Sequence, residues 1–372
     1  MTVERDIAGF ALPFAAGTAL AAAIFRVGYS FCPISILPLL CIWGISMGIL
    51  AYSCQSQLKI STLWFGIIVL SLTSGVLAGL TGAWLHIAET AENGLISDAA
   101  HRFCAGLRNL IAEVPFRSDE TPAIITALIT GDRSALSTRT ILAFRESGAS
   151  HILALSGLHL GIIYGMIRIF LSVLGNSPKI RVAKSIITVL ACGFYCIGTG
   201  ASPSIVRALI FIIAGEAANI LGRHRSIRQV LFTALTIQLV FNSADIREIG
   251  FQLSYAAMFG IAYIYPPLQR LWPEEKHASL ISKALRWLWN SMAISISCQL
   301  TTAPLALYYF GTLPEHFLLT NLIALPLVSI IIPIGLATIG LHAIGICPDL
   351  LIQATETMTE LMRKSLEIIA TM

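Results

Sequence analysis

The sequence predicts an all-α fold, a polytopic membrane helix bundle with about ten transmembrane helices and additional interfacial amphipathic helices. Three observations predict it. Of the 372 residues, 56% are hydrophobic and only 12% are Asp, Glu, Lys or Arg, about half the charged share of a soluble protein. The mean hydropathy is +0.79. Because a water-soluble fold of this length could not cover its surface with so few charges, soluble domains are excluded.

The same composition excludes other classes of protein. The apolar content is too high for intrinsic disorder, and the net charge of +4 is too small for a nucleic-acid binder that acts through bulk charge. The spacings of the eight cysteines match no metal-ligand pattern, so we expect no metal, no cofactor and no disulfide framework. Residues 1–6 do not form a basic leader, so we expect the first apolar segment to be an anchor.

Helices that cross the hydrocarbon core need about 20 mostly apolar residues. Segments that approach this requirement lie at 7–25, 34–52, 60–85, 151–174, 185–200, 203–221, 229–243, 249–265, 287–310 and 316–342. The last segment is long and contains Pro326 and Pro333, which favour a broken or partly re-entrant path.

Lysines and arginines predict the orientation of the bundle. They cluster at every second connection, at Lys179/Arg181/Lys184, Arg223/Arg225/Arg228, Arg270/Lys276/Lys283/Arg286 and Arg363/Lys364. The intervening connections, near Ser202, Asp245 and Thr312, contain only Arg247. Because cytoplasmic loops carry the excess of basic residues, we expect a multi-pass protein of the cell (inner, cytoplasmic) membrane. Both termini are then cytoplasmic, and residues 86–150 lie outside.

The segment 86–150 has six arginines and eight acidic residues and differs from the apolar rest of the chain. Its apolar residues recur in steps of four and three up to Pro115, at Ile96, Ala100, Phe103, Leu107, Leu110 and Val114. This periodicity predicts a helix that lies on the outer membrane surface or docks on the bundle. Two shorter helices are expected after it, one from near Pro122 to Gly131 and one from about Ser137 to Gly148.

These patterns divide the chain into four parts. Residues 1–85 form an N-terminal three-helix membrane segment, and residues 86–150 form extracytoplasmic or interfacial amphipathic helices. A membrane bundle follows at 151–345, and an amphipathic tail at 346–372. We expect the tail to be an interfacial helix that closes the bundle.

Four polar motifs occur in order along the chain. The first is Gly131-Asp-Arg-Ser followed by Gly148-Ala-Ser-His-Ile-Leu-Ala-Leu-Ser-Gly-Leu-His-Leu-Gly161. The second is Gly200-Ala-Ser-Pro-Ser-x-x-Arg207-Ala, and the third is Asp245 with Gly250-Phe-Gln-Leu-Ser-Tyr-Ala-Ala. The fourth is Cys298-Gln-Leu-Thr-Thr-Ala-Pro304, Phe310-Gly and Asn321-x-x-x-x-Pro326. Together they resemble the signature of the ComEC competence family over about residues 120–342.

The resemblance implies an inner-membrane channel that imports transforming single-stranded DNA in natural competence. The chain has neither the soluble OB-like domain of full-length members nor the His-x-His-x-Asp-His cluster of their metallo-β-lactamase-like domain. It therefore resembles a short form with the channel portion alone, and we expect no nuclease or other enzyme activity. No P-loop sequence is present either. The expected partners are single-stranded DNA, membrane lipid, a separate cytoplasmic translocation ATPase, a DNA receptor, a nuclease and, in a homo-oligomer, further copies of the chain.

The candidate residues of the DNA path are the polar members of these motifs and spans. They are Asp132, His151, Ser156, His159, Ser204, Arg207, Gln252, Ser254, Ser295 and Gln299. At about 100° per residue, His151, Ser156 and His159 share one side of the predicted span 151–174, and polar groups inside a membrane usually face the bundle interior or a water-filled cavity. The alternative is that Ser156 bonds its own backbone and that the histidines cap or bridge helices.

Arg207 is the strongest single candidate, because a cation inside a membrane helix is expensive. It follows Pro203 by four residues, about 6 Å into its helix, and a guanidinium group suits phosphate. Snorkelling, or pairing with an acid on a neighbouring helix, is the alternative. Glu216 lies on the opposite face of the same helix. On the ninth span a polar stripe, formed by Ser291, Ser295, Gln299 and Thr302, suits pore lining and contact between helices equally.

Two other functions compete with the DNA channel. An intramembrane serine hydrolase would use Ser156 and His159, one turn apart, with Asp132 to orient the imidazole. Residues three apart on one helix seldom align for proton transfer, and no oxyanion loop is evident. A channel core adapted to another cargo is the remaining alternative.

Overall fold

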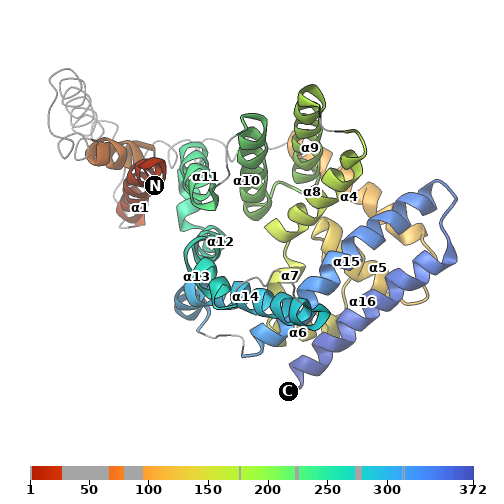
Figure 1. The fold of residues 1–372 in the computed structure, drawn as a ribbon. Coiled ribbons are helices and arrows are strands. Elements are labelled where there is room, and N and C mark those ends of the chain that lie inside the picture. The colour runs from red at the N-terminus through yellow and green to blue at the C-terminus, as the bar shows by residue number, and fades with distance from the viewer. Residues whose placement is uncertain are drawn as a thin grey trace. The chain divides into compact units, whose positions relative to one another are not determined.

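Figure 1 shows the computed structural model of the chain. It describes residues 2–26, 67–78, 95–175, 177–222, 226–272, 279–311, 313 and 315–372. All regular structure among these residues is helical, which confirms the predicted all-α fold. The chain divides into two compact units, one of residues 1–93 and 217–255 and one of residues 94–216 and 256–372. The predicted span 34–52 lies outside the described residues.

The first unit contains α1 (Thr2–Arg26) and a helix at Ile67–Ala78. Glycines let the two approach closely: a Cβ on Gly17 or on Gly75 would collide with a backbone carbonyl of the facing helix. Small residues at such contacts are typical of membrane helices. The first helix matches the predicted span 7–25, and the second lies inside the predicted span 60–85.

The rest of the first unit is a helical turn and its two flanking helices. α11 (Ile227–Phe241) packs against α1. The short 3₁₀ helix η2 (Ser243–Arg247) then leads to α12 (Ile249–Phe259). Asn242 caps η2, because its side-chain oxygen accepts a hydrogen bond from the Ala244 N–H at 3.3 Å.

The second unit begins with the three helices predicted for the segment 86–150. They are α4 (Leu95–Glu113), α5 (Glu120–Thr130) and α6 (Thr138–Glu146). Each boundary follows the expected signal. α5 ends at Gly131, whose φ of 78° is left-handed, and α6 begins after Ser137, whose hydroxyl accepts the Thr140 N–H at 3.2 Å.

These three helices dock on the bundle, one of the two arrangements expected from the sequence. Nine residues of α5, Thr121 and 123–130, are buried, so this helix has almost no free face. Ile111 of α4 and Ile125 and Ile129 of α5 form one apolar cluster with Ile339 of a later helix. Hydrophobic packing therefore holds the segment in place.

The predicted continuous span 151–174 is wrong at its start, because the helix is broken. α7 (Ser150–Leu153) stops, and α8 (Gly157–Ser172) begins only after an extended linker. Ala154 has a ψ of 128°, and Ser156 has φ −125° and ψ 171°. His151 is consequently not on the same helix as Ser156 and His159, so the shared face inferred for a straight helix does not exist.

α9 (Pro178–Gly198) and α10 (Pro203–Ile220) follow. α9 starts seven residues before the predicted span, which began at 185. Ser177 caps the helix, since its hydroxyl accepts the Ile180 N–H at 3.4 Å. Pro178 suits the first turn of a helix. Its basic residues Lys179, Arg181 and Lys184, expected in a loop, therefore lie in the first two turns of the helix.

The eighth predicted span continues beyond its expected end. α12 passes into the π-helical segment η3 (Gly260–Ile264), followed by α13 (Tyr265–Arg270). Pro266 and Pro267 provide no N–H for the preceding turn, which explains why the wider π turn forms there.

The chain ends in three long helices, α14 (Leu280–Phe310), α15 (Phe317–Ala343) and α16 (Asp349–Ala370). α15 is one helix with Pro326 and Pro333 inside it, so the break expected there is wrong. α15 and α16 lie side by side (Figure 1). The predicted amphipathic tail forms α16, which packs on the bundle: Met362 and Leu366 are buried in one cluster with Phe144 of α6.

By length and composition, α9, α10 and α15 are each able to cross a membrane, among the residues that the structure describes. α14 also contains much of a predicted span, 287–310. These apolar helices agree with the membrane protein expected from the composition.

Candidate functional site

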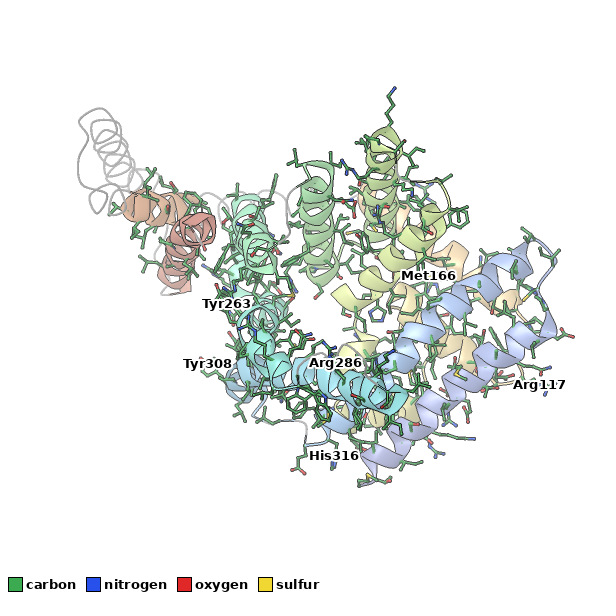
Figure 2. All side chains as sticks on the ribbon, viewed as in Figure 1. Arg117, Met166, Tyr263, Arg286, Tyr308 and His316 are labelled. Carbon is green, nitrogen blue, oxygen red and sulfur yellow. The ribbon has the colours of Figure 1, made fainter. Side chains whose placement is uncertain are left out.

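Four candidate residues of the second unit, Ser156, His159, Ser204 and Arg207, lie near the start of α8. Figure 2 draws the side chains, and the labelled Met166 marks α8. Two other candidate residues, Gln252 and Ser254, belong to the first unit. Ser254 is half-buried in α12, and Gln252 is described below.

The Gly131-Asp-Arg-Ser turn ties α4 to the end of α5. Asp132 Oδ1 accepts the Ser134 N–H at 3.0 Å, and Asp132 Oδ2 accepts a short hydrogen bond from Arg108 of α4. The hydrogen bonds from Ser134, and then the Arg108 charge, lower the pKa of Asp132 below its ordinary 3.8. This carboxylate therefore holds a turn together, and its described contacts are with Arg108 and Ser134.

The next residue of this turn fixes the end of α7. Arg133 Nε donates to the Leu153 carbonyl oxygen at 3.0 Å. This carbonyl belongs to the last turn of α7, which a continuing helix would otherwise satisfy. His151 Nδ1 lies 3.1 Å from the Gly148 carbonyl oxygen and donates to it. The Arg133 contact stabilises the end of α7, and the His151 contact stabilises its start.

Ser156 and His159 form a reciprocal cap at the start of α8. The Ser156 N–H donates to His159 Nδ1 at 3.2 Å, and Ser156 Oγ lies 3.0 Å from the same nitrogen. A backbone N–H always donates, so Nδ1 carries no proton and the neutral imidazole has its proton on Nε2. His159 is 0% exposed, and its Nε2 has no hydrogen-bond partner among the described residues.

The second turn of α10 lies next to the start of α8. A Cβ on Gly157 would be 3.4 Å from Ala208 Cβ, and Leu160 and Ile205 share one buried cluster. Arg207 is 2% exposed, and its Nη2 donates to Ser204 Oγ at 2.9 Å. The structure thus brings Ser156, His159, Ser204 and Arg207 into one region of the second unit.

A second polar cluster lies further along the same helices, around Glu216. This residue of α10 is 1% exposed. It accepts hydrogen bonds from Tyr164 of α8 and from Ser185 of α9, each at 2.6 Å, and Arg168 of α8 lies 3.5 Å away. Sequence reasoning noted Glu216 but missed these partners. Tyr164 and Arg168 are four apart on α8, a spacing that indicates one shared face.

The third motif forms a network inside the first unit. Asp245 accepts hydrogen bonds from Gln238 Nε2 at 2.6 Å and from Asn242 Nδ2 at 2.7 Å. Tyr255 donates to Gln238 Oε1 at 3.2 Å. Gln252, a candidate path residue, donates to the Ile246 carbonyl oxygen at 2.9 Å. These bonds close the turn between α11 and α12.

The polar stripe of α14 bonds largely to its own helix. Ser291 Oγ donates to the Trp287 carbonyl oxygen at 3.0 Å, and Thr302 Oγ1 to that of Cys298 at 2.9 Å. Ser295 is 6% exposed, and Gln299 is half-buried. α14 also packs tightly on η3, where a Cβ on Gly260 would collide with the Ser297 carbonyl oxygen. Close packing between helices therefore accounts for part of this stripe.

Comparison with known proteins identifies relatives over most of the chain. The model of a family described as Competence protein matches residues 128–372. The chain is 28% identical over 222 residues to ComE operon protein 3 of Bacillus subtilis, and 23% identical over 219 residues to Recombination protein 2 of Haemophilus influenzae. It is 24% identical over 278 residues to the uncharacterized protein YcaI of Escherichia coli.

These alignments cover 58%, 56% and 72% of the chain, in the same order, but only 25%, 27% and 34% of the relatives. The chain therefore spans a quarter to a third of the length of the relatives it matches. No solved structure matches it.

Proposed function

Because the chain belongs to the Competence protein family, we propose that it is a membrane channel through which single-stranded DNA enters the cell in natural competence. Relatives named ComE operon protein 3 and Recombination protein 2 support a role in competence and in the handling of DNA. The family model matches residues 128–372, and the polar motifs in this part of the chain support the channel role that we propose for it.

The observation that carries the proposal is the buried cation in the family's second motif. Arg207 is 2% exposed and lies in α10, one of the described helices able to cross a membrane. A buried guanidinium group is costly unless it serves a bound or passing anion or a structural pair. A path for a polyanion needs cations to offset phosphate charge, and few of them, because a strong trap would stop transit.

We further propose a multi-pass orientation with the N-terminus in the cytoplasm and residues 86–150 outside, from the distribution of basic residues. The C-terminus was expected in the cytoplasm, but α16 packs on α6 and Arg139 pairs with Glu367 at 3.1 Å. These contacts hold the end of α16 beside α6, which belongs to the segment 86–150. With that segment outside, we propose an outer C-terminus in place of the cytoplasmic one predicted from the basic residues.

The sequence has no P-loop, so we propose that a separate cytoplasmic ATPase moves the DNA. A DNA receptor, a nuclease and further copies of the chain are the other partners that we propose. Lipid surrounds the exposed apolar residues of α9, which include Leu190 at 67% and Phe194 at 64% exposure.

An intramembrane serine hydrolase is the competing function, favoured by the 3.0 Å separation of Ser156 Oγ and His159 Nδ1. Against it, Nδ1 already accepts the Ser156 N–H, and Asp132 contacts Arg108 and Ser134. Covalent labelling of Ser156 by a fluorophosphonate would favour the hydrolase. A channel core for another cargo would leave DNA uptake unchanged when the gene is deleted.

The test is uptake of labelled DNA by a naturally transformable host that produces this protein. Arg207→Gln should lower uptake at least tenfold, and Arg207→Lys should restore part of it, because the charge is kept. Arg181→Gln, at an exposed position of α9, is the matched control and should leave uptake unchanged. Normal uptake by Arg207→Gln at normal protein level would refute the channel proposal.

A further inference from the structure

We propose that the adjoining starts of α8 and α10 form a binding site for one phosphodiester group, with the His159 imidazole N–H and the Ser202 hydroxyl as side-chain donors. The site rests on the proposed function, since the phosphodiester would belong to the passing strand. Three observations carry it, and each is independent of the family comparison.

The first observation is that α8 and α10 run in the same direction, with the start of α8 beside the second turn of α10. Gly157 of α8 adjoins Ala208 of α10, and further along Tyr164 of α8 bonds Glu216 of α10. The residue numbers rise together, so α8 and α10 are parallel and their N-termini lie at the same end. Each N-terminus has backbone N–H groups without an intrahelical acceptor and about half a positive charge, so the two fields add.

The second observation is the buried donor of His159. Because Nδ1 accepts the Ser156 N–H at 3.2 Å, the ring lies over the first turn of α8 and its remaining proton is on Nε2. That atom is buried and has no partner among the described residues. A buried donor without an acceptor destabilises the folded protein, and an anionic acceptor at the helix start would remove this cost.

The third observation is at the start of α10. Ser202 precedes Pro203, the first residue of that helix, and its Oγ is also buried without a hydrogen-bond partner in the described part of the chain. The nearby buried Arg207, which donates to Ser204, adds a full positive charge. Two unsatisfied donors and a cation at paired helix starts are the groups that bind phosphate in proteins.

The charges of the surrounding helices suit an anion at this end. The buried carboxylate of these helices, Glu216, lies nine residues beyond Arg207, about 14 Å along α10, and Tyr164, Ser185 and Arg168 surround it. A neutral histidine and a hydroxyl bind a phosphodiester without trapping it, as passage requires. The donors are covered in this structure, so binding requires the 154–156 linker to shift.

The experiment uses the purified full chain in a phosphate-free detergent, labelled with ¹⁵N-histidine, and follows the His159 Nε2–H signal by NMR. The titrants are the hexanucleotide (dT)₆, inorganic phosphate and a short-chain phosphatidylglycerol. We expect a saturable shift with (dT)₆ and with phosphate. Ser202→Ala, which leaves the α8 cap intact, should weaken (dT)₆ binding about tenfold, as expected for one hydrogen bond to a charged group. His342→Gln, in the last turn of α15, is the histidine control and should bind normally.

An unchanged His159 signal at saturating (dT)₆ would overturn the site, even if the protein binds DNA elsewhere and supports uptake. A response to phosphatidylglycerol alone would also overturn it, because the occupant would then be a lipid headgroup. Failure of the proposed function would give a different result. DNA uptake would then be normal in a strain without the gene, whereas the NMR response of the purified protein would persist.

Discussion

The Tyr164 hydroxyl donates to the Glu216 carboxylate across 2.6 Å and thereby joins α8 to α10 inside an apolar bundle. Ser185 adds a second bond at 2.6 Å from α9, so one carboxylate connects three helices. A buried carboxylate is stable only when its partners replace the lost water, which makes this cluster the most sensitive structural contact of the second unit.

Removal of the Glu216 carboxylate should therefore lower the free energy of unfolding more than removal of any single partner. We expect Glu216→Ala to destabilise the protein by about 3 kcal/mol, because Arg168 loses its ion pair and two hydroxyls lose their acceptor. Tyr164→Phe should cost about 1 kcal/mol. Unfolding by dodecyl sulfate in mixed micelles measures both. Equal losses for the two variants would contradict the assignment of Glu216 as the centre of the cluster.

Gly260→Ala should separate η3 from α14. The added Cβ would collide with the Ser297 carbonyl oxygen and would lie 2.8 Å from Thr301 Oγ1, and overpacking of this kind costs about 1–3 kcal/mol. Gly193→Ala on α9 is the matched control, because nothing lies within 4 Å of its Cβ. The same micelle unfolding assay should show a loss for the first variant and none for the second.

Acid should lower the stability of the folded protein, because protonation of Glu360 removes its interaction with Arg363 on α16. The hydrogen bond from Arg363 holds the pKa of Glu360 at about 2, below its ordinary 4.5. Because the folded pKa is the lower one, the ionised group contributes fully above about pH 4.5, and the contribution is lost as the pH falls toward 2. Glu360 is partly exposed, so solvent screening keeps the effect small. Thermal unfolding at several pH values should show a smaller acid loss for Glu360→Gln than for the unchanged protein; identical profiles would exclude this role.

The two ends of the α6–α16 contact should lie on one side of the membrane. Single cysteines at Arg139 and Met372, exposed by 79% in the Arg139 side chain and 75% in Met372, should react together with an impermeant maleimide in a background without the native cysteines. A cysteine at the exposed Lys179 of α9 should react from the opposite side. Labelling of positions 139 and 372 from different sides would show that α16 does not pack on α6.

Local signals in the sequence were sufficient to predict many of the helices and their boundaries. Pro115, Gly131 and Ser137 mark boundaries that the structure reproduces closely, because each acts through its own backbone or its nearest neighbours. The apolar stripe of α4 likewise indicated a packed face.

Features that depend on distant residues could not be predicted. α7 ends at Leu153, which is followed by neither glycine nor proline, and Arg133, a residue twenty positions earlier, bonds the carbonyl of Leu153. His159 takes the place in the cap that glutamate or glutamine usually occupies, so the usual motif did not reveal it. The partners of Glu216 lie on two other helices, and only the fold shows that they meet.

The two prolines of α15 have a mechanical consequence. Pro326 and Pro333 leave the carbonyls of Leu322 and Ser329, four residues before each, without their usual intrahelical donors. The two prolines are seven residues apart, which is about 20° short of two full helical turns. The two carbonyls without donors therefore lie on nearly the same face of α15. Bends at the two positions therefore add in one plane, so α15 can curve toward one side. Because α16 packs along α15, it would curve with it.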